Sequence, residues 1–392
     1  MLIKKSFKFR VYPNREQQHG LTIQFGHSRF VYNHYRALRE SYYQETGKGL
    51  SGYDTINLLT KLKKDHEFEW LKEADSQVLQ QKLKDLDTAY KNFFKGNAKY
   101  PNFKSKRNKQ SIRYPQRFKL NGKKVYLPKV GWINLKQHRP IEGKMKNCTV
   151  SRTKSGKYFV SIQCEVEIDE PKFEGAEVGI DLGLIDFITC SNGEKVEPPK
   201  YLRKAEVKLK RLQRGLSRKI KGSNGFKKAK LKLARQFEKV TNQRRDFHHK
   251  LSKMLVDANK LLGFENLNIA GMIKNHHIAK SISDAGWAQF VQFCEYKGQW
   301  YGCYIEKVGR FFPSSKLCSE CGKKCQTLKL STREWACMGC GVVHDRDRNA
   351  AVNILNEIKH TAGTAEINAD GENVRPETFV LAGSLKSEAS LL

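Results

Sequence analysis

Residues 318–351 contain two cysteine pairs and an acidic segment, Cys318-Ser-Glu-Cys321-Gly322, Cys337-Met-Gly-Cys340-Gly341 and His344-Asp345-Arg346-Asp347-Arg348-Asn349-Ala350-Ala351. Fifteen residues separate the two pairs, a spacing typical of a tetrahedral zinc site. A glycine follows each pair and suits the tight turn that directs two sulfurs at one metal ion. We therefore predict that Zn²⁺ is bound by Cys318, Cys321, Cys337 and Cys340. Four protein ligands leave no open coordination position, so the expected role is structural.

Three carboxylates lie at positions that predict a second metal centre. Asp181 interrupts the apolar segment 178–190, where an unpaired carboxylate would be costly, and Glu265 ends the apolar segment that begins at Leu261. Asp347 falls in the first turn of the last predicted helix, where the helix dipole favours its ionised form. A lone aspartate at a strand more often has a structural role. Together the three could hold two divalent ions, although spacing alone leaves open whether they meet in space.

The charge of the chain indicates a polyanionic partner. Lys and Arg number 73 against 40 Asp and Glu, which gives a net charge of +33. Nucleic acid is the expected partner, and a basic protein without a special ligand is the alternative. We expect no membrane span, because no run of eighteen apolar residues occurs and the N-terminus reads as a strand. The cysteines do not resemble a disulfide framework, which favours a reducing cytoplasm.

The remaining cysteines and histidines suggest no rival site. His248-His249 and His276-His277 lie in basic polar surroundings and are expected to face solvent. Cys325 is interpreted as a spare thiol. Five other cysteines lie in apolar segments and are expected in the core, namely Cys148, Cys164, Cys190, Cys294 and Cys303.

A basic helical hairpin is predicted between the two acidic strands, with its turn near residues 222–225. Residues 203–250 contain eighteen Lys or Arg and three acids. Leucines recur at three and four residues along its first helix and predict a packed seam. Such unbalanced charge is self-repelling unless phosphates lie along it, although a merely solvated hairpin is the alternative. The residues predicted to face phosphates are Lys208, Lys210, Arg211, Arg214, Arg218 and Lys219.

The hydrophobic pattern predicts a multidomain α+β chain. A strand over 2–12 is expected to join a β-rich region that contains hairpins at 118–128 and 148–164. Helices over 14–45, 54–66 and 74–95 are inserted between this first strand and the β-rich region. After residue 176, strands alternate with helices, which is typical of an α/β layer fold. One of these helices is expected over 285–299, capped by Ser283 or Asp284, and the last over 346–359.

The sequence resembles the TnpB (OrfB) family, the RNA-guided nucleases of certain bacterial and archaeal insertion sequences, which are relatives of type V CRISPR effectors. The resemblance covers about residues 1–360. It rests on Phe30-Val-Tyr-Asn-His34, Thr88-Ala-Tyr-Lys-Asn-Phe-Phe94, Gly179-Ile-Asp-Leu-Gly183, Ser281-Ile-Ser-Asp-Ala-Gly-Trp287, Phe312-Pro-Ser-Ser-Lys-Leu-Cys318, the second cysteine pair and Asp345-Arg-Asp-Arg-Asn-Ala-Ala351.

The resemblance implies a domain order that agrees with the pattern. A β-barrel-like wedge domain would span 1–13 and 96–172, with a helical recognition domain inserted at 14–95. A RuvC-like (RNase H-type) α/β nuclease domain would span 173–311 and 343–360, interrupted by a zinc ribbon at 312–342. Residues 361–392 would form a mobile tail.

The resemblance also implies an activity and its site. Asp181, Glu265 and Asp347 would be the Mg²⁺ ligands, and Asp345 would cap the last helix. A guide RNA from the transposon end would pair with one strand of a double-stranded target DNA, while the protein reads a short flanking motif. Candidates for that reading are Tyr53 and Gln80. A guided repressor that does not cut, and a transposase that joins DNA ends, are the alternatives; the usual transposase is a separate partner protein.

Overall fold

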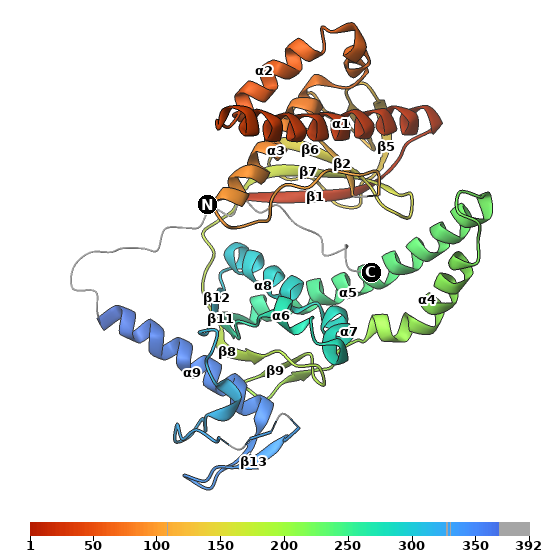
Figure 1. The fold of residues 1–392 in the computed structure, drawn as a ribbon. Helices are drawn as coiled ribbons and strands as arrows, with labels where there is room; N and C mark the ends of the chain where they lie inside the picture. The colour runs from red at the N-terminus through yellow and green to blue at the C-terminus, as the bar shows by residue number, and fades with distance from the viewer. Residues whose placement is uncertain (108, 327, 330, 368–392) are drawn as a thin grey trace. The chain divides into compact units, whose positions relative to one another are not determined.

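A computed structural model of the protein describes residues 1–107, 109–326, 328–329 and 331–367. The chain divides into two compact units. The first comprises Met1–Pro171 and Tyr201–Asp246, and the second comprises Lys172–Lys200 and the chain from Phe247 onward. Figure 1 shows the helices and strands of both units. None of the described helices is long and apolar enough to cross a membrane.

The first unit is built on a seven-stranded antiparallel sheet in the order β2-β6-β7-β1-β5-β4-β3. The central strand β1 pairs with β7 along Leu2–Val11 and with β5 along Arg10–Tyr12. The predicted first strand and both predicted hairpins are confirmed. β2 and β3 form the two edges, so the sheet is open, whereas the sequence predicted a barrel-like domain. The strands are β1 (Leu2–Tyr12), β2 (Gln110–Tyr114), β3 (Lys119–Asn121), β4 (Lys124–Leu127), β5 (Gly131–Lys136), β6 (Lys144–Arg152) and β7 (Tyr158–Glu167).

The helical part of this unit follows β1 directly. Its elements are α1 (Arg15–Thr46), α2 (Gly52–Leu62), η1 (His66–Glu73) and α3 (Ser76–Phe94). α1 begins as predicted, because Asn14 Oδ1 accepts from Gln17 N at 2.8 Å and Gln17 Oε1 accepts from Asn14 N at 3.0 Å. Gly47 ends the helix with a φ of 67°, a conformation that glycine adopts without strain. The apolar stripe of α3 packs in one core with residues of α1.

The predicted basic hairpin consists of α4 (Tyr201–Ser217) and α5 (Asn224–Ala258). Gly222 lies in the turn between them with a φ of 89°. Leu209 is buried, and Leu212 and Leu216 are half-buried. The predicted leucine seam is therefore confirmed.

The second unit contains a five-stranded sheet in the order β10-β9-β8-β11-β12. β8 and β12 both run parallel to β11, and β9 runs antiparallel to β8. The strands are β8 (Ala176–Asp181), β9 (Ile188–Cys190), β10 (Lys195–Val196), β11 (Asn259–Phe264) and β12 (Tyr304–Lys307). The other elements are α6 (Ile269–Met272), α7 (His276–Ala285), α8 (Trp287–Tyr301), η2 (Ser314–Lys316), β13 (Glu334–Ala336), β14 (Val343–Asp345) and α9 (Arg346–Ile367).

Glycines let the last helix lie directly on this sheet. α9 packs against β8 and β11, as Figure 1 shows. A Cβ atom at Gly179 would lie 2.0 Å from the carbonyl oxygen of Ala351, and one at Gly263 would lie 2.5 Å from Ile358 Cδ1. Gly179 and Gly263 are paired in the β8–β11 register. The glycine of the Gly179-Ile-Asp segment therefore serves close packing between strand and helix.

Three local predictions are wrong. Ser283 and Asp284 do not cap a helix start, because both lie in α7 and Gly286 separates α7 from α8. His248 does not face solvent: its side chain is 0% exposed, and its Nε2 lies 2.9 Å from the carbonyl oxygen of Ala285. The last helix continues to Ile367, beyond its predicted end. The remainder of the predicted mobile tail, 368–392, lies outside the described residues.

Candidate functional site

The three candidate carboxylates come from adjacent elements of the second unit. Ile180 on β8 lies opposite Phe264 on the parallel strand β11, so Asp181 and Glu265 are at the same edge of the sheet. Asp347 lies in the first turn of α9. The structure brings these residues close enough for strong electrostatic coupling. Burial raises the pKa of Asp181 well above its usual range, and the charges of Glu265 and Asp347 raise it further.

Two groups partly compensate this concentration of negative charge. Burial raises the pKa of Glu265, whereas a hydrogen bond donated by the Ser314 hydroxyl to its carboxylate lowers it. Arg333 lies on the segment between the two cysteine pairs, and its Nη1 is 2.9 Å and 3.2 Å from the two carboxylate oxygens of Asp347. Sequence reasoning gave no role to Ser314, although it lies in the quoted segment 312–318, and missed Arg333, because neither residue has a spacing that links it to a carboxylate.

The donor set suits hard divalent cations. Carboxylate oxygens are the ligands that Mg²⁺ prefers, and a cation would relieve the repulsion that raises the pKa of Asp181. Among the described residues, only the four cysteines form a group of three or more candidate ligands within 4.8 Å of one another. The ligand oxygens of Asp181, Glu265 and Asp347 therefore do not all lie within that distance of one another.

Asp345 has a different environment from Asp347. Its Oδ1 accepts hydrogen bonds from the backbone N–H groups of Asp347 at 3.1 Å and Arg348 at 2.9 Å, as a helix cap does. Its Oδ2 accepts from Lys195 Nζ at 2.7 Å. Burial would raise the pKa of Asp345, but these hydrogen bonds lower it overall. The carboxylate of Asp345 is thus engaged in capping α9, as predicted.

The four predicted zinc ligands converge. Their sulfurs all lie within 4.8 Å of one another, and the Cys318–Cys340 and Cys321–Cys337 sulfur pairs are each 3.6 Å apart. A tetrahedral ion with Zn–S distances of about 2.3 Å requires sulfurs about 3.8 Å apart, so the cluster fits Zn²⁺. Backbone N–H groups of Cys340 and Gly339 lower the pKa of the Cys337 thiol to about 6, whereas a backbone hydrogen bond lowers the pKa of Cys321 and of Cys340 less than burial and the neighbouring thiols raise it. The convergence of the four sulfurs, and not the thiol pKa values, therefore supports a metal site.

A buried histidine supports this cluster. His344 Nε2 lies 3.0 Å from Cys318 Sγ, and the His344 ring packs on Trp335 with the ring centroids 5.0 Å apart. The two residues face each other in the β13–β14 register. The cysteine spacing alone predicts no role for His344. An N–H group beside a ligating sulfur orients the ligand and adjusts its charge.

Two asparagines of α9 tie the cysteine cluster to the carboxylate site. Asn349 donates from Nδ2 to the carbonyl oxygen of Leu317 at 2.6 Å and accepts from Ser319 N at 2.9 Å. Asn353 donates to the carbonyl oxygens of Ser314 and Leu317, each at 2.8 Å. Both amides are buried. The helix that carries Asp347 therefore also holds the segment that carries Ser314 and Cys318.

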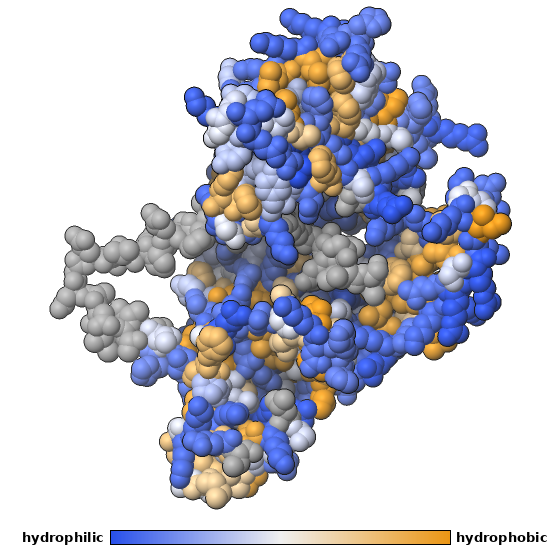
Figure 2. All heavy atoms as spheres, in the orientation of Figure 1, coloured by the Kyte–Doolittle hydropathy of each residue, from blue (hydrophilic) through white to orange (hydrophobic). Residues whose placement is uncertain are grey.

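The predicted nucleic-acid contacts lie in the first unit. Figure 2 shows hydrophilic side chains covering much of the α4–α5 hairpin. Lys210 forms an ion pair with Glu206 at 2.8 Å, so part of its charge is already compensated. Tyr53 on α2 is 73% exposed, and Gln80 on α3 is half-buried. All six predicted basic residues are exposed, namely Lys208, Lys210, Arg211, Arg214, Arg218 and Lys219.

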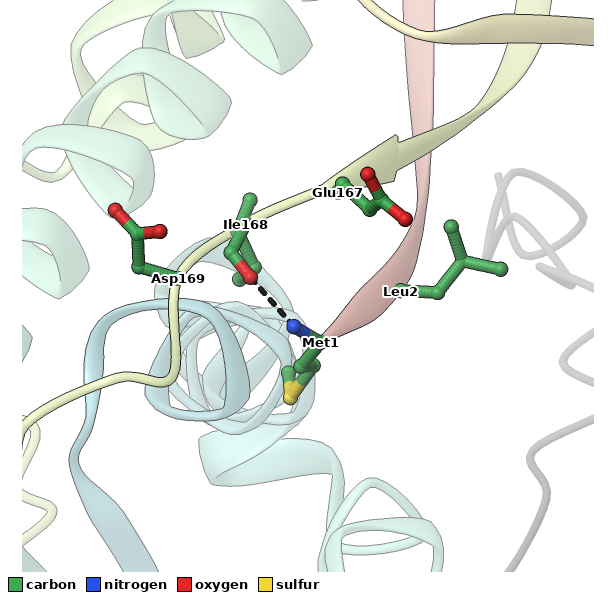
Figure 3. A pocket seen from close by; sticks show the side chains of 5 residues that line it. All are labelled: Met1, Leu2, Glu167, Ile168 and Asp169. Carbon is green, nitrogen blue, oxygen red and sulfur yellow. Dashed lines mark hydrogen bonds between the residues drawn. The ribbon is translucent and has the colours of Figure 1, made fainter.

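A cavity of about 590 Å³ lies apart from all these residues, where β1 begins and β7 ends. Figure 3 shows the residues that line it, among them Glu167 and Asp169. The amino group of Met1 donates to the carbonyl oxygen of Ile168 at 2.6 Å. This contact anchors the start of β1 beside the end of β7.

Comparisons with known proteins agree with the sequence motifs. Residues 161–276 match the OrfB_IS605 family, described as "Probable transposase", and residues 287–354 match "Cas12f1-like, TNB domain". Residues 1–48 match a family described as "Helix-turn-helix domain", although the structure has β1 and one uninterrupted helix over most of this range.

Full-length relatives match almost the whole chain. A "Putative RNA-guided DNA endonuclease" of Streptomyces pristinaespiralis is 40% identical over 380 residues, which cover 96% of this chain and 93% of the relative. The "Putative RNA-guided DNA endonuclease InsQ" of Escherichia coli is 35% identical over 371 residues, which cover 90% and 91%. A Cas12f1 chain solved in complex with sgRNA and target DNA has a similar fold, with a TM-score of 0.56, 15% identity, and coverage of 91% of this chain and 99% of that chain.

Proposed function

Because this chain belongs to the TnpB (OrfB) family, we propose that it is an RNA-guided DNA endonuclease that cuts by metal-dependent phosphodiester hydrolysis. The observation that carries the proposal is the placement of Asp181 and Glu265 at the ends of parallel strands beside Asp347 of α9. We assign the α/β part of the second unit as a RuvC-like nuclease domain. Residues 312–342 would be its zinc ribbon.

The three carboxylates would hold two Mg²⁺ ions. When bound, the ions supply an activated water and stabilise the leaving 3′ oxygen. Asp181 at the end of β8 and Glu265 directly after β11 would supply carboxylate ligands, and the Ser314 hydroxyl orients the carboxylate of Glu265. The guanidinium of Arg333 neutralises Asp347 and has the planar donor geometry that suits a phosphate oxygen. Asp345 and Asn349 keep α9 in place.

The guide would be an RNA from the transposon end, and target specificity would come from base pairing. The sheet of the first unit and its inserted helices would form the wedge and recognition domains. There, Tyr53 and Gln80 are candidates for reading a short duplex motif beside the target. The exposed lysine and arginine side chains of α4 and α5 are candidates for phosphate contacts. Expected partners are the guide RNA and double-stranded target DNA, with a transposase linked in function.

The test begins with RNA that copurifies with the protein from cells. Its sequence would identify the guide, and a plasmid library with random bases beside the target would reveal the flanking motif. The parent complex should cut these plasmids only when Mg²⁺ is present. Substitution of any of the three carboxylates by alanine should abolish cutting and retain guided DNA binding, because these side chains hold ions and do not grip the duplex.

The alternative is a guided repressor that binds DNA without cutting. Guided binding without cutting by the parent would favour the repressor.

Asp345→Asn is a matched control in the same acidic segment. It should lower activity only partly, because it alters a helix cap. Retained cutting in Asp347→Ala, together with loss in Asp345→Asn, would contradict the assignment of the third ligand.

A further inference from the structure

The first unit contains a second cavity, to which the proposed function assigns no role. It measures about 350 Å³ and lies where β1, β5 and the β3–β4 turn meet. In the strand register Arg10 lies opposite Lys136, and Tyr12 lies opposite Asn134. The cavity is lined by Tyr12, Lys123, Asn134, Leu135, Lys136 and Gln137.

The side chains around this cavity offer an aromatic ring beside positive charge. Tyr12 is 52% exposed. The guanidinium carbon of Arg10 lies 5.3 Å from the centre of the Tyr12 ring and 5.3 Å from that of Phe159. A cation on one side of an aromatic ring holds the ring in place. Asn134 and Gln137 add amide groups that can donate to or accept from a base edge.

Arg10 does not line the cavity but supports the ring of Tyr12, which does. Its Nε and Nη1 atoms are buried, and within the described part of the chain they have no hydrogen-bond partner. Glu238, a carboxylate that attracts Arg10, already pairs with Lys157 at 2.8 Å. Buried donors on a charged group are normally satisfied. Because these atoms are buried, Arg10 acts here by holding the Tyr12 ring and not by contacting a ligand.

The positive charge of the segment that lines the cavity indicates a polyanionic ligand. Residues 88–141 contain fifteen Lys or Arg and no Asp or Glu. Tyr126 and Trp132 form an adjacent aromatic pair with ring centroids 5.4 Å apart, and Trp132 is 42% exposed. Exposed rings interleaved with lysines are the pattern by which sheets bind single-stranded nucleic acid. Duplex bases are already stacked on each other and would leave such rings unused.

We propose that this cavity binds an unpaired nucleotide of the guide RNA, with its base stacked on Tyr12 and its flanking phosphates held by Lys123 and Lys136. Neighbouring unpaired bases would stack on the Tyr126–Trp132 pair. The proposal rests on the proposed function, since it takes the guide RNA as the ligand. It goes beyond that function by assigning a protein surface to an unpaired region of the RNA.

The test compares three tyrosine variants in binding to the copurified guide RNA. Tyr12→Ala should weaken RNA affinity about 5- to 150-fold, the range for loss of one base–aromatic stack. Tyr12→Phe keeps the ring and should stay within about twofold of the parent. Tyr43→Ala is the matched control, because Tyr43 is 61% exposed on α1 and lies outside the cavity. Ribonuclease protection should show an unpaired segment exposed in Tyr12→Ala alone.

Unchanged RNA affinity and protection in Tyr12→Ala would overturn the proposal. Weakened binding of single-stranded target DNA with unchanged RNA affinity would also overturn it, and would assign the cavity to the displaced DNA strand. If Tyr12→Ala unfolds, Lys123→Gln with Lys136→Gln should make the slope of log affinity against log salt shallower by about 1.4. Because RNA binding is measured without cutting, a parent that binds RNA through Tyr12 but cuts no DNA would contradict the proposed function alone.

Discussion

Replacement of Ser314 by alanine should reduce Mg²⁺ affinity by tenfold to a hundredfold. Ser314 is 3% exposed, and its hydroxyl donates to the carboxylate of Glu265. A hydrogen bond to a charged group contributes about 1.5–3 kcal/mol, which is about a 10- to 150-fold change in an equilibrium constant. Loss of a group that orients a metal ligand commonly costs 10- to 100-fold in metal affinity or activity. The two ranges agree.

The same substitution should change the pH dependence of cutting. The hydroxyl favours the ionised form of Glu265 and so lowers its pKa, against the effect of burial. Without it the pKa of Glu265 rises further, and the carboxylate must ionise before it can bind a cation. The acidic limb of the rate profile should therefore move to higher pH in Ser314→Ala. The loss of activity should be larger at low pH than at high pH.

The assay is plasmid cutting by the guide-loaded protein, titrated with Mg²⁺ at several pH values. Ser314→Thr keeps the hydroxyl and should recover much of the loss, while Ser315→Ala is a matched control on the same short helix. Zinc content and thermal unfolding verify that the fold survives. Equal Mg²⁺ half-saturation and superimposed pH profiles in parent and Ser314→Ala would refute the reasoning.

Three further predictions concern the cysteine cluster, Arg333 and the basic hairpin. Purified protein should contain about one zinc per chain, and Cys318→Ser or Cys340→Ser should lower zinc content and, indirectly, cutting; elemental analysis of active protein without zinc would contradict the site. Arg333→Ala should impair cutting more than guided binding, because it removes a donor that suits a phosphate oxygen; a gel-shift titration beside the cutting assay separates the two, and equal losses would argue against it. Glutamine at Arg211, Arg214 and Arg218 together should make the salt dependence of RNA binding shallower by about two to three units with unchanged circular dichroism; identical slopes would mean that the hairpin is only solvated.

Features encoded by neighbouring residues could be predicted from the sequence. The helix over 14–45 and the four-cysteine cluster each depend on spacing within a short segment. Asp181 and Glu265 could be placed because apolar segments identify strands, and the resemblance then selected them. Their proximity depends on a parallel register that no local pattern contains.

The missed features depend on contacts between distant segments. Arg333, on the segment between the two cysteine pairs, contacts Asp347 across 14 residues, and Ser314 contacts Glu265 across 49 residues. His248 lies in a basic stretch that reads as exposed, yet tertiary packing buries it and places its ring beside Phe187. The boundary between α7 and α8 was misplaced because Gly286, and not the polar residues before it, separates the two helices.

The close approach of α9 to Gly179 has a consequence for classifying members of this family from genomes. A criterion based only on intact acidic residues would overlook this position. A methyl group at position 179 would meet the Ala351 carbonyl and displace the helix that carries Asp347, while every acid stays in the alignment. Natural variants with alanine or serine here would be inactive nucleases that pass the acid-residue criterion. Purified Gly179→Ala should bind its target and fail to cut it.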